Sequence, residues 1–221
     1  SQTVDYNGKA TKPSNPTKMG YTFVEWQLNG QTYNFNTAVT NNITLTAVWT
    51  INQYTVSFNS NGGSNVASQT VDYNGKATKP SNPTKTGYTF KEWQLNGQTY
   101  NFNTAVTSNI TLTAVWTINQ YTVTFTSSNN GYVFDTQQVE HGGKAVQPSG
   151  LNTTQYNFTF RKENGEIFDF NTPIISNMNI LVESELKQFT VTFNSNGGSN
   201  VASQTINYNG KATKPSNPTK K

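Results

Sequence analysis

The sequence predicts a mainly β protein built from tandem copies of one small domain. Residues 1–53 recur as residues 68–120 with three substitutions, at a constant offset of 67. A looser copy begins at Tyr121, and a partial copy begins at Phe189. A period of this length corresponds to one small domain per copy, so the 221 residues form an array and not a single fold.

Composition supports β structure and excludes several kinds of site. Aromatic residues make up 13% of the chain and charged residues 12%. Segments rich in aromatic residues and Thr, separated by Asn and Gly, are typical of strands and turns. There is no Cys, which excludes a disulfide framework or a thiolate metal site and favours a bacterial surface or intracellular protein over a eukaryotic secreted one. The net charge of +4 is mild and dispersed, so it does not indicate nucleic-acid binding.

The chain contains no apolar run long enough for a membrane span and no signal peptide. It begins and ends inside a repeat, so we expect it to be part of a longer protein, with any export signal or anchor outside these residues.

The first half of one repeat is predicted from residues 54–87. Alternation of apolar and polar residues over 54–58 predicts a half-buried strand, and the sequence NSNGGSN at 59–65 predicts a turn. A second alternating segment, 67–73, ends at an Asn-Gly pair. Residues 76–87 contain two prolines and are predicted to form a loop or a single helical turn.

The second half of the repeat contains a predicted hairpin and a last strand. Phe90 and Trp93 have opposite parity in the third strand, so we expect a β-bulge at 91–92 that returns them to one face. Asn-Gly at 96–97 is a strong signal for a two-residue hairpin loop. The last strand, 110–116, points alternate residues inward.

The join between repeats is predicted to be short and stiff. The alternation changes phase across 119–120, where two cores meet. The linker is therefore only Thr-Ile-Asn-Gln at 117–120, which contains no Gly or Pro and should allow little freedom.

The two tryptophans of a repeat are expected to share one buried core. In the third copy, at an offset of 68, Arg161 and Ser184 stand where Trp93 and Trp116 stand in the second. Their joint loss suggests one core, which Phe160 and Phe168 would partly refill.

Two frames describe the folding unit. The preferred frame has complete repeats at 54–120 and 121–188, with incomplete repeats at 1–53, which lacks the first strand, and at 189–221. The alternative frame has units near 1–67, 68–135 and 136–202, with the strand of the 54–58 type closing each unit. In the preferred frame residues 1–53 lack a strand that residues 189–193 could offer, so we expect end-to-end self-association.

Several local motifs resemble the Listeria–Bacteroides repeat. They are YTVSF followed by Gly62-Gly63, the loop with Pro80 and Pro83, GYTF at 87–90 followed by Trp93, and NITLTAVW at 109–116. The resemblance implies a β-grasp-like fold on extracellular bacterial proteins, often in tandem as a stalk or as part of an adhesin. It implies no catalytic or cofactor residues, and the third copy departs from it at both Trp positions.

Three lysines are the candidate binding residues. Lys76, Lys79 and Lys85 recur in the regular copies and could form a weakly basic patch for anionic polymers, multiplied along the array. The alternative is a solvated loop. His141 is the only histidine, and each regular copy has few carboxylates, such as Glu92, so neither a metal site nor an acid–base pair is predicted.

The sequence therefore predicts a non-catalytic stalk or spacer in an extended array on the bacterial cell surface, with a contribution to adhesion. The alternative is a dedicated ligand-binding adhesin module whose site lies on the divergent third copy. Expected partners are cell-wall polymer, host glycan or a host surface protein. No cofactor, metal ion, nucleic acid or membrane span is expected.

Overall fold

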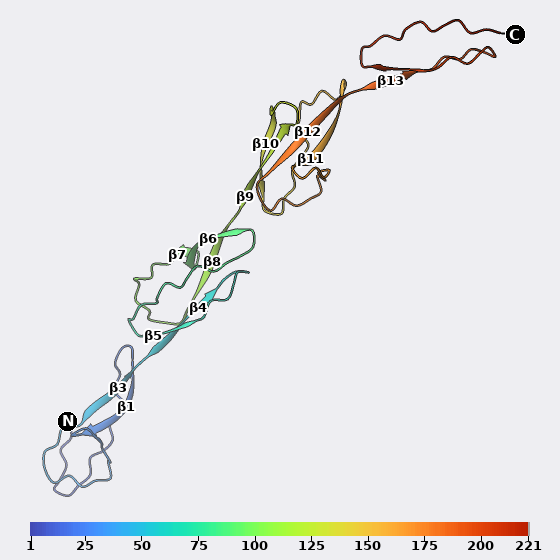
Figure 1. Ribbon diagram of the computed structural model, residues 1–221. Coiled ribbons are helices and arrows are strands. Elements are labelled where there is room, and N and C mark those ends of the chain that lie inside the picture. The colour runs from blue at the N-terminus through green and yellow to red at the C-terminus, as the bar shows by residue number, and fades with distance from the viewer. Residues whose placement is uncertain (221) are drawn as a thin grey trace. The chain divides into compact units, whose positions relative to one another are not determined.

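A computed structural model describes residues 1–220, and within that range it contains strands and turns but no α-helix (Figure 1). The mainly β, tandem-repeat fold is confirmed, and the loop 76–87 contains no helical turn. The described residues accordingly contain no helix that could cross a bilayer. The chain divides into two compact units, Ser1–Thr117 and Ile118–Lys221.

The first unit contains two sheets. One has the strand order β2-β1-β3, with β1 Tyr21–Leu28, β2 Gln31–Thr32 and β3 Thr46–Ile51. The other has the order β5-β4-β8-β6-β7, with β4 Gln53–Asn59, β5 Gln69–Asp72, β6 Tyr88–Leu95, β7 Gln98–Thr99 and β8 Ile110–Ile118. Strands β4 and β8 run parallel, whereas β4 and β5 run antiparallel. The strand that opens the repeat therefore lies inside the sheet, between β5 and β8.

The second unit repeats this arrangement. Its larger sheet has the order β10-β9-β12-β11, with β9 Gln120–Ser127, β10 Val133–Glu140, β11 Tyr156–Lys162 and β12 Met178–Leu186. Strands β9 and β12 are parallel, as β4 and β8 are. A two-stranded sheet follows, made of β13 Gln188–Val191 and β14 Gln204–Asn207.

Two hydrophobic cores account for most of the buried side chains. The buried members of the first all lie between Val56 and Ala114, and those of the second between Val123 and Val182. Each core thus draws on the strand that opens its repeat, β4 or β9. We propose on this basis that the folding units are 54–120 and 121–188.

Trp93 and Trp116 contact the same core, but they differ in burial. Trp93 is 2% exposed, whereas Trp116 is half-buried at the edge of the cluster. Phe90 packs against both, with ring centroids 5.5 Å from Trp93 and 5.6 Å from Trp116. The expectation that both rings are fully buried is therefore wrong for Trp116, whose indole N–H donates to the Ser60 carbonyl at 2.9 Å.

The predicted bulge is present in the first repeat. Val24 is the counterpart of Lys91, and the pairing with β3 shifts there: Phe23 lies opposite Trp49, but Glu25 lies opposite Val48. The extra residue places Phe23 and Trp26 on one face, where their ring centroids are 5.6 Å apart.

The third repeat has no such bulge, and this corrects the comparison of Trp93 with Arg161. Strand β11 pairs regularly with β12, with Phe160 opposite Val182. Phe160 is consequently the inward residue, 8% exposed, and its carbonyl accepts the Phe168 N–H at 2.8 Å, as the Trp93 carbonyl accepts the Tyr100 N–H. Phe160 therefore occupies the place of Trp93 directly.

The third repeat lacks the extra residue of the bulge in its strand, but it has one extra residue in its hairpin loop. In the second repeat Leu95 pairs with Gln98 across a two-residue loop. In the third the Lys162 N–H donates to the Glu166 carbonyl at 2.8 Å, so the loop is one residue longer. A constant offset along the sequence therefore misaligns the residues that lie between the position of the bulge and the hairpin loop, Phe160 among them.

Candidate functional site

The joins between repeats are strands and not loops. In the first unit only Asn52 separates β3 from β4, and Figure 1 shows β3 leading directly into β4. The Asn52 N–H donates to the Gly20 carbonyl at 2.9 Å, and the Asn52 carbonyl accepts the Tyr73 N–H at 2.7 Å. Gly20 precedes β1 of one repeat, and Tyr73 follows β5 of the next. Both ladders therefore continue through the join.

Side chains reinforce this join. The Tyr73 ring lies so close to Gly20 that a Cβ added there would be 1.8 Å from the ring. Gly20 also has φ of +77°, a conformation that other residues rarely adopt. In addition, the Thr22 hydroxyl of β1 donates to the Asn52 side-chain oxygen at 2.7 Å. The first repeat thus contacts the second through both backbone and side chains.

The same backbone pattern recurs in the second unit. The Lys187 N–H donates to the Gln155 carbonyl at 2.9 Å, and the Lys187 carbonyl accepts the Tyr208 N–H at 2.7 Å. Only Lys187 lies between β12 and β13. The prediction of a four-residue linker is wrong, because only one residue of each four-residue join lies outside a strand.

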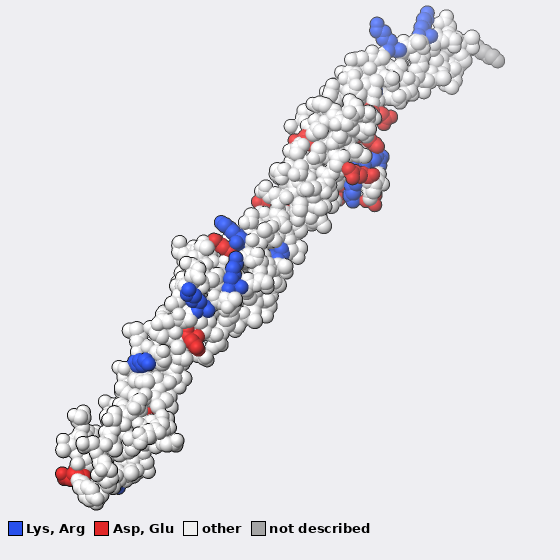
Figure 2. All heavy atoms as spheres, turned by 60° about the vertical axis from the view of Figure 1, so that its left-hand side comes forward, with Lys and Arg blue, Asp and Glu red and all other residues white. Residues whose placement is uncertain are grey.

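The three candidate lysines differ in their surroundings. Lys76 and Lys79 are exposed on the loop after β5. Lys85 is half-buried, and its ammonium lies 3.0 Å from the Asn61 carbonyl and 4.4 Å from the centroid of the Tyr88 ring. On the face drawn in Figure 2 the basic side chains stand as separate groups, with acidic ones among them. Anion binding by Lys76, Lys79 and Lys85 stays a prediction.

Lys85 is better described as part of a brace at one end of the sheet. Its ammonium is 5.7 Å from the centroid of Trp116, and the Trp116 ring covers Gly63, where an added Cβ would be 2.4 Å from the indole. In the first repeat the corresponding Lys18 lies over Tyr21 at 3.9 Å. An ammonium over aromatic faces is stabilised by their quadrupoles. The brace therefore holds the turn 60–63 against β8.

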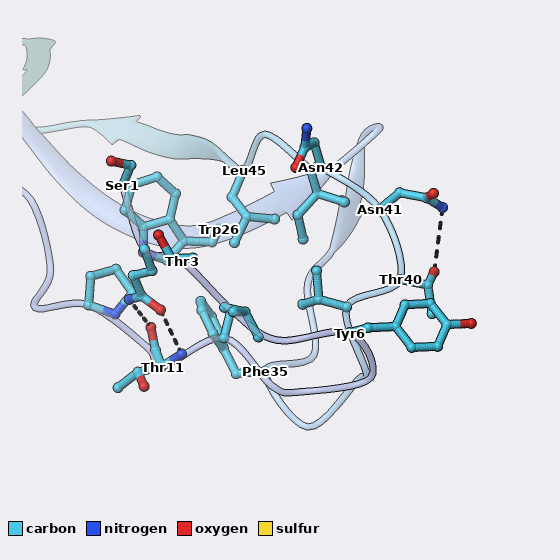
Figure 3. A pocket seen from close by; sticks show the side chains of 16 residues that line it. Ser1, Thr3, Tyr6, Thr11, Trp26, Phe35, Thr40, Asn41, Asn42 and Leu45 are labelled. Atoms are coloured by element: carbon cyan, nitrogen blue, oxygen red, sulfur yellow. Dashed lines mark hydrogen bonds between the residues drawn. The ribbon is translucent and has the colours of Figure 1, made fainter.

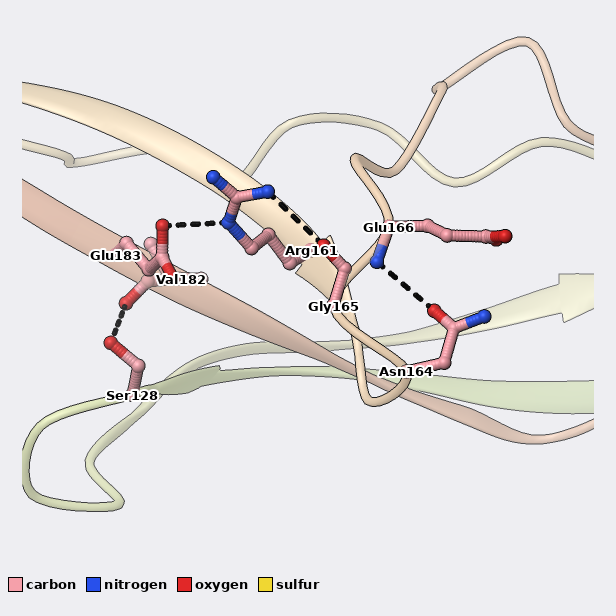
Figure 4. Close-up of polar contacts among 7 residues, drawn as sticks. All are labelled: Ser128, Arg161, Asn164, Gly165, Glu166, Val182 and Glu183. Carbon is pink, nitrogen blue, oxygen red and sulfur yellow. Dashed lines mark hydrogen bonds and ion pairs between the residues drawn. The ribbon is translucent and has the colours of Figure 1, made fainter.

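The third repeat has lost this brace and has a polar network on its strands. Thr153 and Ser184 stand at the positions of Lys85 and Trp116. The Arg161 guanidinium forms an ion pair with Glu183 at 2.8 Å and donates to the Gly165 carbonyl at 3.1 Å (Figure 4). Lys85 and Trp116, which contact each other in the second repeat, are thus both replaced by small polar residues in the third, whereas Phe160 takes the place of Trp93.

Several titratable groups have pKa values that are shifted by their surroundings. Hydrogen bonds from Thr99 at 2.6 Å and Gln94 at 2.7 Å hold the pKa of Glu92 below its ordinary value of 4.5, and Glu25 has the same kind of environment. Burial raises the pKa of Tyr100. Within residues 1–220 no three His, Asp or Glu side chains gather as metal ligands would.

His141 occupies the join position that Tyr73 occupies in the second repeat. Its backbone N–H donates to the Asn119 carbonyl at 2.8 Å, and its ring centroid is 5.9 Å from that of Tyr121. This role was not predicted from the sequence, although an offset of 68 aligns His141 with Tyr73.

Large exposed apolar side chains distinguish the two central repeats. The second repeat has none within residues 54–120. The third has five: Tyr132, Val133, Val146, Ile167 and Ile175.

Comparison with known proteins identifies the repeats. Four segments of the chain, 1–48, 54–115, 121–182 and 189–221, match the Listeria-Bacteroides repeat domain. A protein of Evansella cellulosilytica whose name describes a Gly-rich membrane protein is 32% identical over 98% of this chain and 26% of its own length. Internalin H of Listeria monocytogenes is 38% identical over 54% of this chain and 23% of its own. The chain spans about a quarter of the length of each of these relatives.

Among solved structures, SHIRT domains 3-4 of a cell surface protein (Streptococcal High Identity Repeats in Tandem) align with 61% of this chain and 98% of that chain. The identity is 20% and the TM-score 0.24, which is too low to support a statement about fold. The four sequence matches together cover most of the chain, and they coincide with the repeats seen in the sequence. The chain therefore belongs to the Listeria-Bacteroides repeat domain family, in four tandem copies.

Proposed function

We propose that these repeats are a non-catalytic spacer in the extracellular part of a bacterial cell-surface protein. The observation that carries the proposal is the join at Asn52, where a strand passes from one repeat to the next with hydrogen bonds to both. A linker built as paired strand resists bending, whereas a loop does not.

The energetics support a stiff join. Bending at Asn52 would break its bonds to Gly20 and Tyr73, each worth about 0.5–1.5 kcal/mol net. It would also separate the Tyr73 ring from the surface of Gly20. A second join of the same backbone pattern at Lys187 indicates that this is a property of the repeat and not of one pair.

The location rests on the relatives. One is named as a membrane protein and another as an internalin, and the chain spans only about a quarter of each. A repeated domain that forms part of a much longer surface protein suits a spacer that carries other domains away from the cell. Cell-wall polymer, a host glycan or a host surface protein would be the contacts of such a stalk.

The join can be tested with a matched pair of substitutions. Gly20→Ala should push the Tyr73 ring out of place, whereas Gly30→Ala is the control, because Gly30 has a similar φ of +81° and no atom within 4 Å of an added Cβ. In ¹⁵N relaxation measurements residues 21–51 and 54–117 should tumble together in the parent and in Gly30→Ala. In Gly20→Ala the two segments should tumble more independently of each other.

Independent tumbling in the parent would refute a stiff join. Small-angle scattering on chains with added copies of residues 54–120 tests the spacer itself. The maximum dimension should grow linearly with copy number, and a particle whose size barely changes would end the proposal.

The second candidate function is a binding module on the third repeat. It is favoured by the five large apolar side chains that this repeat exposes and the second repeat does not. Replacing residues 121–188 with a copy of 54–120 would leave a spacer intact but remove such a site. Unchanged adhesion of cells displaying the replaced chain would exclude this candidate, and loss of adhesion would favour it over a spacer alone.

A further inference from the structure

In each central repeat the strand that brings the chain in lies beside the strand that leads it out. In the second repeat the entry strand is β4, which follows β3 after a single residue, and the exit strand is β8 (Figure 1). They run parallel, with residues 56–59 paired to 110–113. In the third repeat the entry strand β9 and the exit strand β12 are paired in the same way, through 123–127 and 178–182.

This topology fixes the direction in which tension along the chain acts on the paired strands. The chain enters β4 at Gln53, and the parallel pairing begins at Val56. The pairing ends on β8 at Thr113, and the chain leaves that strand at Ile118. The two points therefore lie at opposite ends of the ladder, and tension between them makes β4 and β8 slide lengthwise past each other. The hydrogen bonds of a parallel ladder are evenly spaced, so they share this load.

The entry and exit strands are inner strands of their sheets. Strand β4 lies between β5 and β8, and β8 lies between β4 and β6. Strands β9 and β12 are likewise the two inner strands of the third repeat. On the core side Val56 and Leu112 are completely buried, as are Val123 and Ile180. Hydrogen bonds with surroundings of low dielectric constant are electrostatically stronger than hydrogen bonds in water, so burial strengthens the ladder.

An asparagine side chain extends each ladder at its beginning. The Thr55 N–H donates to the Asn109 side-chain oxygen at 2.8 Å, and the Thr122 N–H donates to that of Asn177 at 2.9 Å. Each asparagine directly precedes the exit strand, which begins at 110 or 178. The entry strand is therefore tied to the exit strand by one bond more than the backbone pairing provides.

The far end of each ladder is also tied, although by different groups. In the second repeat the Trp116 indole N–H of the exit strand donates to the Ser60 carbonyl, directly after the entry strand. In the third repeat the Ser128 backbone N–H and hydroxyl donate to the Val182 carbonyl at 3.1 and 3.4 Å, and Figure 4 shows the hydroxyl contact. Both repeats thus have cross-strand bonds at the two ends of the pairing.

We propose that each central repeat bears tension, with the parallel ladder between its entry and exit strands acting as a clamp against forces that pull the chain lengthwise. This deepens the spacer function and rests on it for the source of the load, which is the pull between the cell and a surface that the longer protein contacts. The load passes from β3 through Asn52 into β4, and so it reaches the clamp without crossing a loop.

The test pulls the second repeat of the complete 221-residue chain in two directions by single-molecule force spectroscopy. The sequence has no Cys, so introduced cysteines define the points of attachment. Gln53→Cys with Thr117→Cys attaches at opposite ends of the ladder, whereas Gln53→Cys with Ser108→Cys attaches at one end, and all three side chains are exposed. The mean unfolding force should be roughly threefold higher for the first pair, because four residue pairs are then loaded together and not in turn.

The third repeat offers a matched second measurement. Gln120→Cys with Glu185→Cys should again resist more force than Gln120→Cys with Ser176→Cys, and these side chains are exposed as well. Equal unfolding forces in the two directions, in either repeat, would overturn the clamp. This result is distinct from failure of the spacer, because a chain that lengthens linearly with copy number yet unfolds at equal forces is a spacer without a clamp. A chain whose joins bend but whose repeats resist lengthwise tension has the clamp without the stiff spacer.

Discussion

Aromatic side chains in identical local sequences differ in burial according to which strands are present. Trp26 and Trp93 have the same neighbours from Glu25 to Val39 and from Glu92 to Val106. Only Trp93 is covered by a first strand, through Phe58. The contribution of each ring to stability therefore depends on β4 and not on the residues beside it.

This difference gives a matched prediction. Trp93→Ala should destabilise the second repeat by about 3–5 kcal/mol, the range for large aromatic deletions in a core. Trp26→Ala should cost the first repeat clearly less, because Trp26 is only half-buried and lines an open cavity (Figure 3). Hydrogen exchange of the full chain, followed by repeat-specific peptides, measures both. Equal losses in protection would show that Trp26 is as well packed as Trp93.

A second residue-scale prediction concerns the carboxylate of Glu92. The Thr99 hydroxyl is the largest cause of its lowered pKa, followed by Gln94. Folding therefore favours the ionised form, so this contribution to stability is present above pH 4.5 and is lost as the pH falls through the lower folded-state pKa. Thr99→Val should raise the midpoint of Glu92 toward its ordinary value in an NMR titration. An unchanged midpoint would show that Thr99 has no such effect.

At the scale of elements, the sequence determines which segments are strands better than it determines their register. Alternation over 54–58 and the parity change at 91–92 predicted a strand and a bulge, because both depend on the two-residue period of a strand. The position of Phe160 was not predictable from a constant offset. Loss of a bulge and a longer hairpin loop cancel in length, so the alignment shows neither.

The joins were mispredicted for a different reason. Residues 117–120 have the local appearance of a short linker, but pairing in such segments depends on partners from two repeats. In the first unit these partners are Gly20 and Tyr73, which are 53 positions apart in sequence. The brace between Lys85 and Trp116 was also missed, since it joins a loop to a strand 31 positions later.

The third repeat suggests an element-scale experiment on the second. Deleting Lys91 should remove the bulge and give a regular strand with Trp93 still facing inward, as Phe160 does in β11. We expect a loss of at most about 1–2 kcal/mol, since no core side chain changes face. Deleting Thr113 is the control, because it turns Leu112 or Ala114 outward. Thermal unfolding measures both losses, and an equal loss of stability for the two deletions would contradict this account of the bulge.

At the scale of the whole molecule, the opening strand of a repeat decides whether that repeat can form a complete core alone. The two core clusters each contain side chains from the opening strand, β4 or β9. A unit that begins after β4 must therefore obtain a strand from elsewhere.

The two frames predict different behaviour of excised segments. Residues 54–120 should unfold cooperatively on their own, since Val56 and Phe58 are present to cover Trp93. Residues 68–135 are of similar length, but their core would have to include Val123 and Phe125. In the structure these two side chains are completely buried in the core of the third repeat. Urea denaturation followed by tryptophan fluorescence should show a sigmoidal transition only for 54–120. A cooperative transition confined to 68–135 would instead establish β9 as the strand that closes the preceding unit.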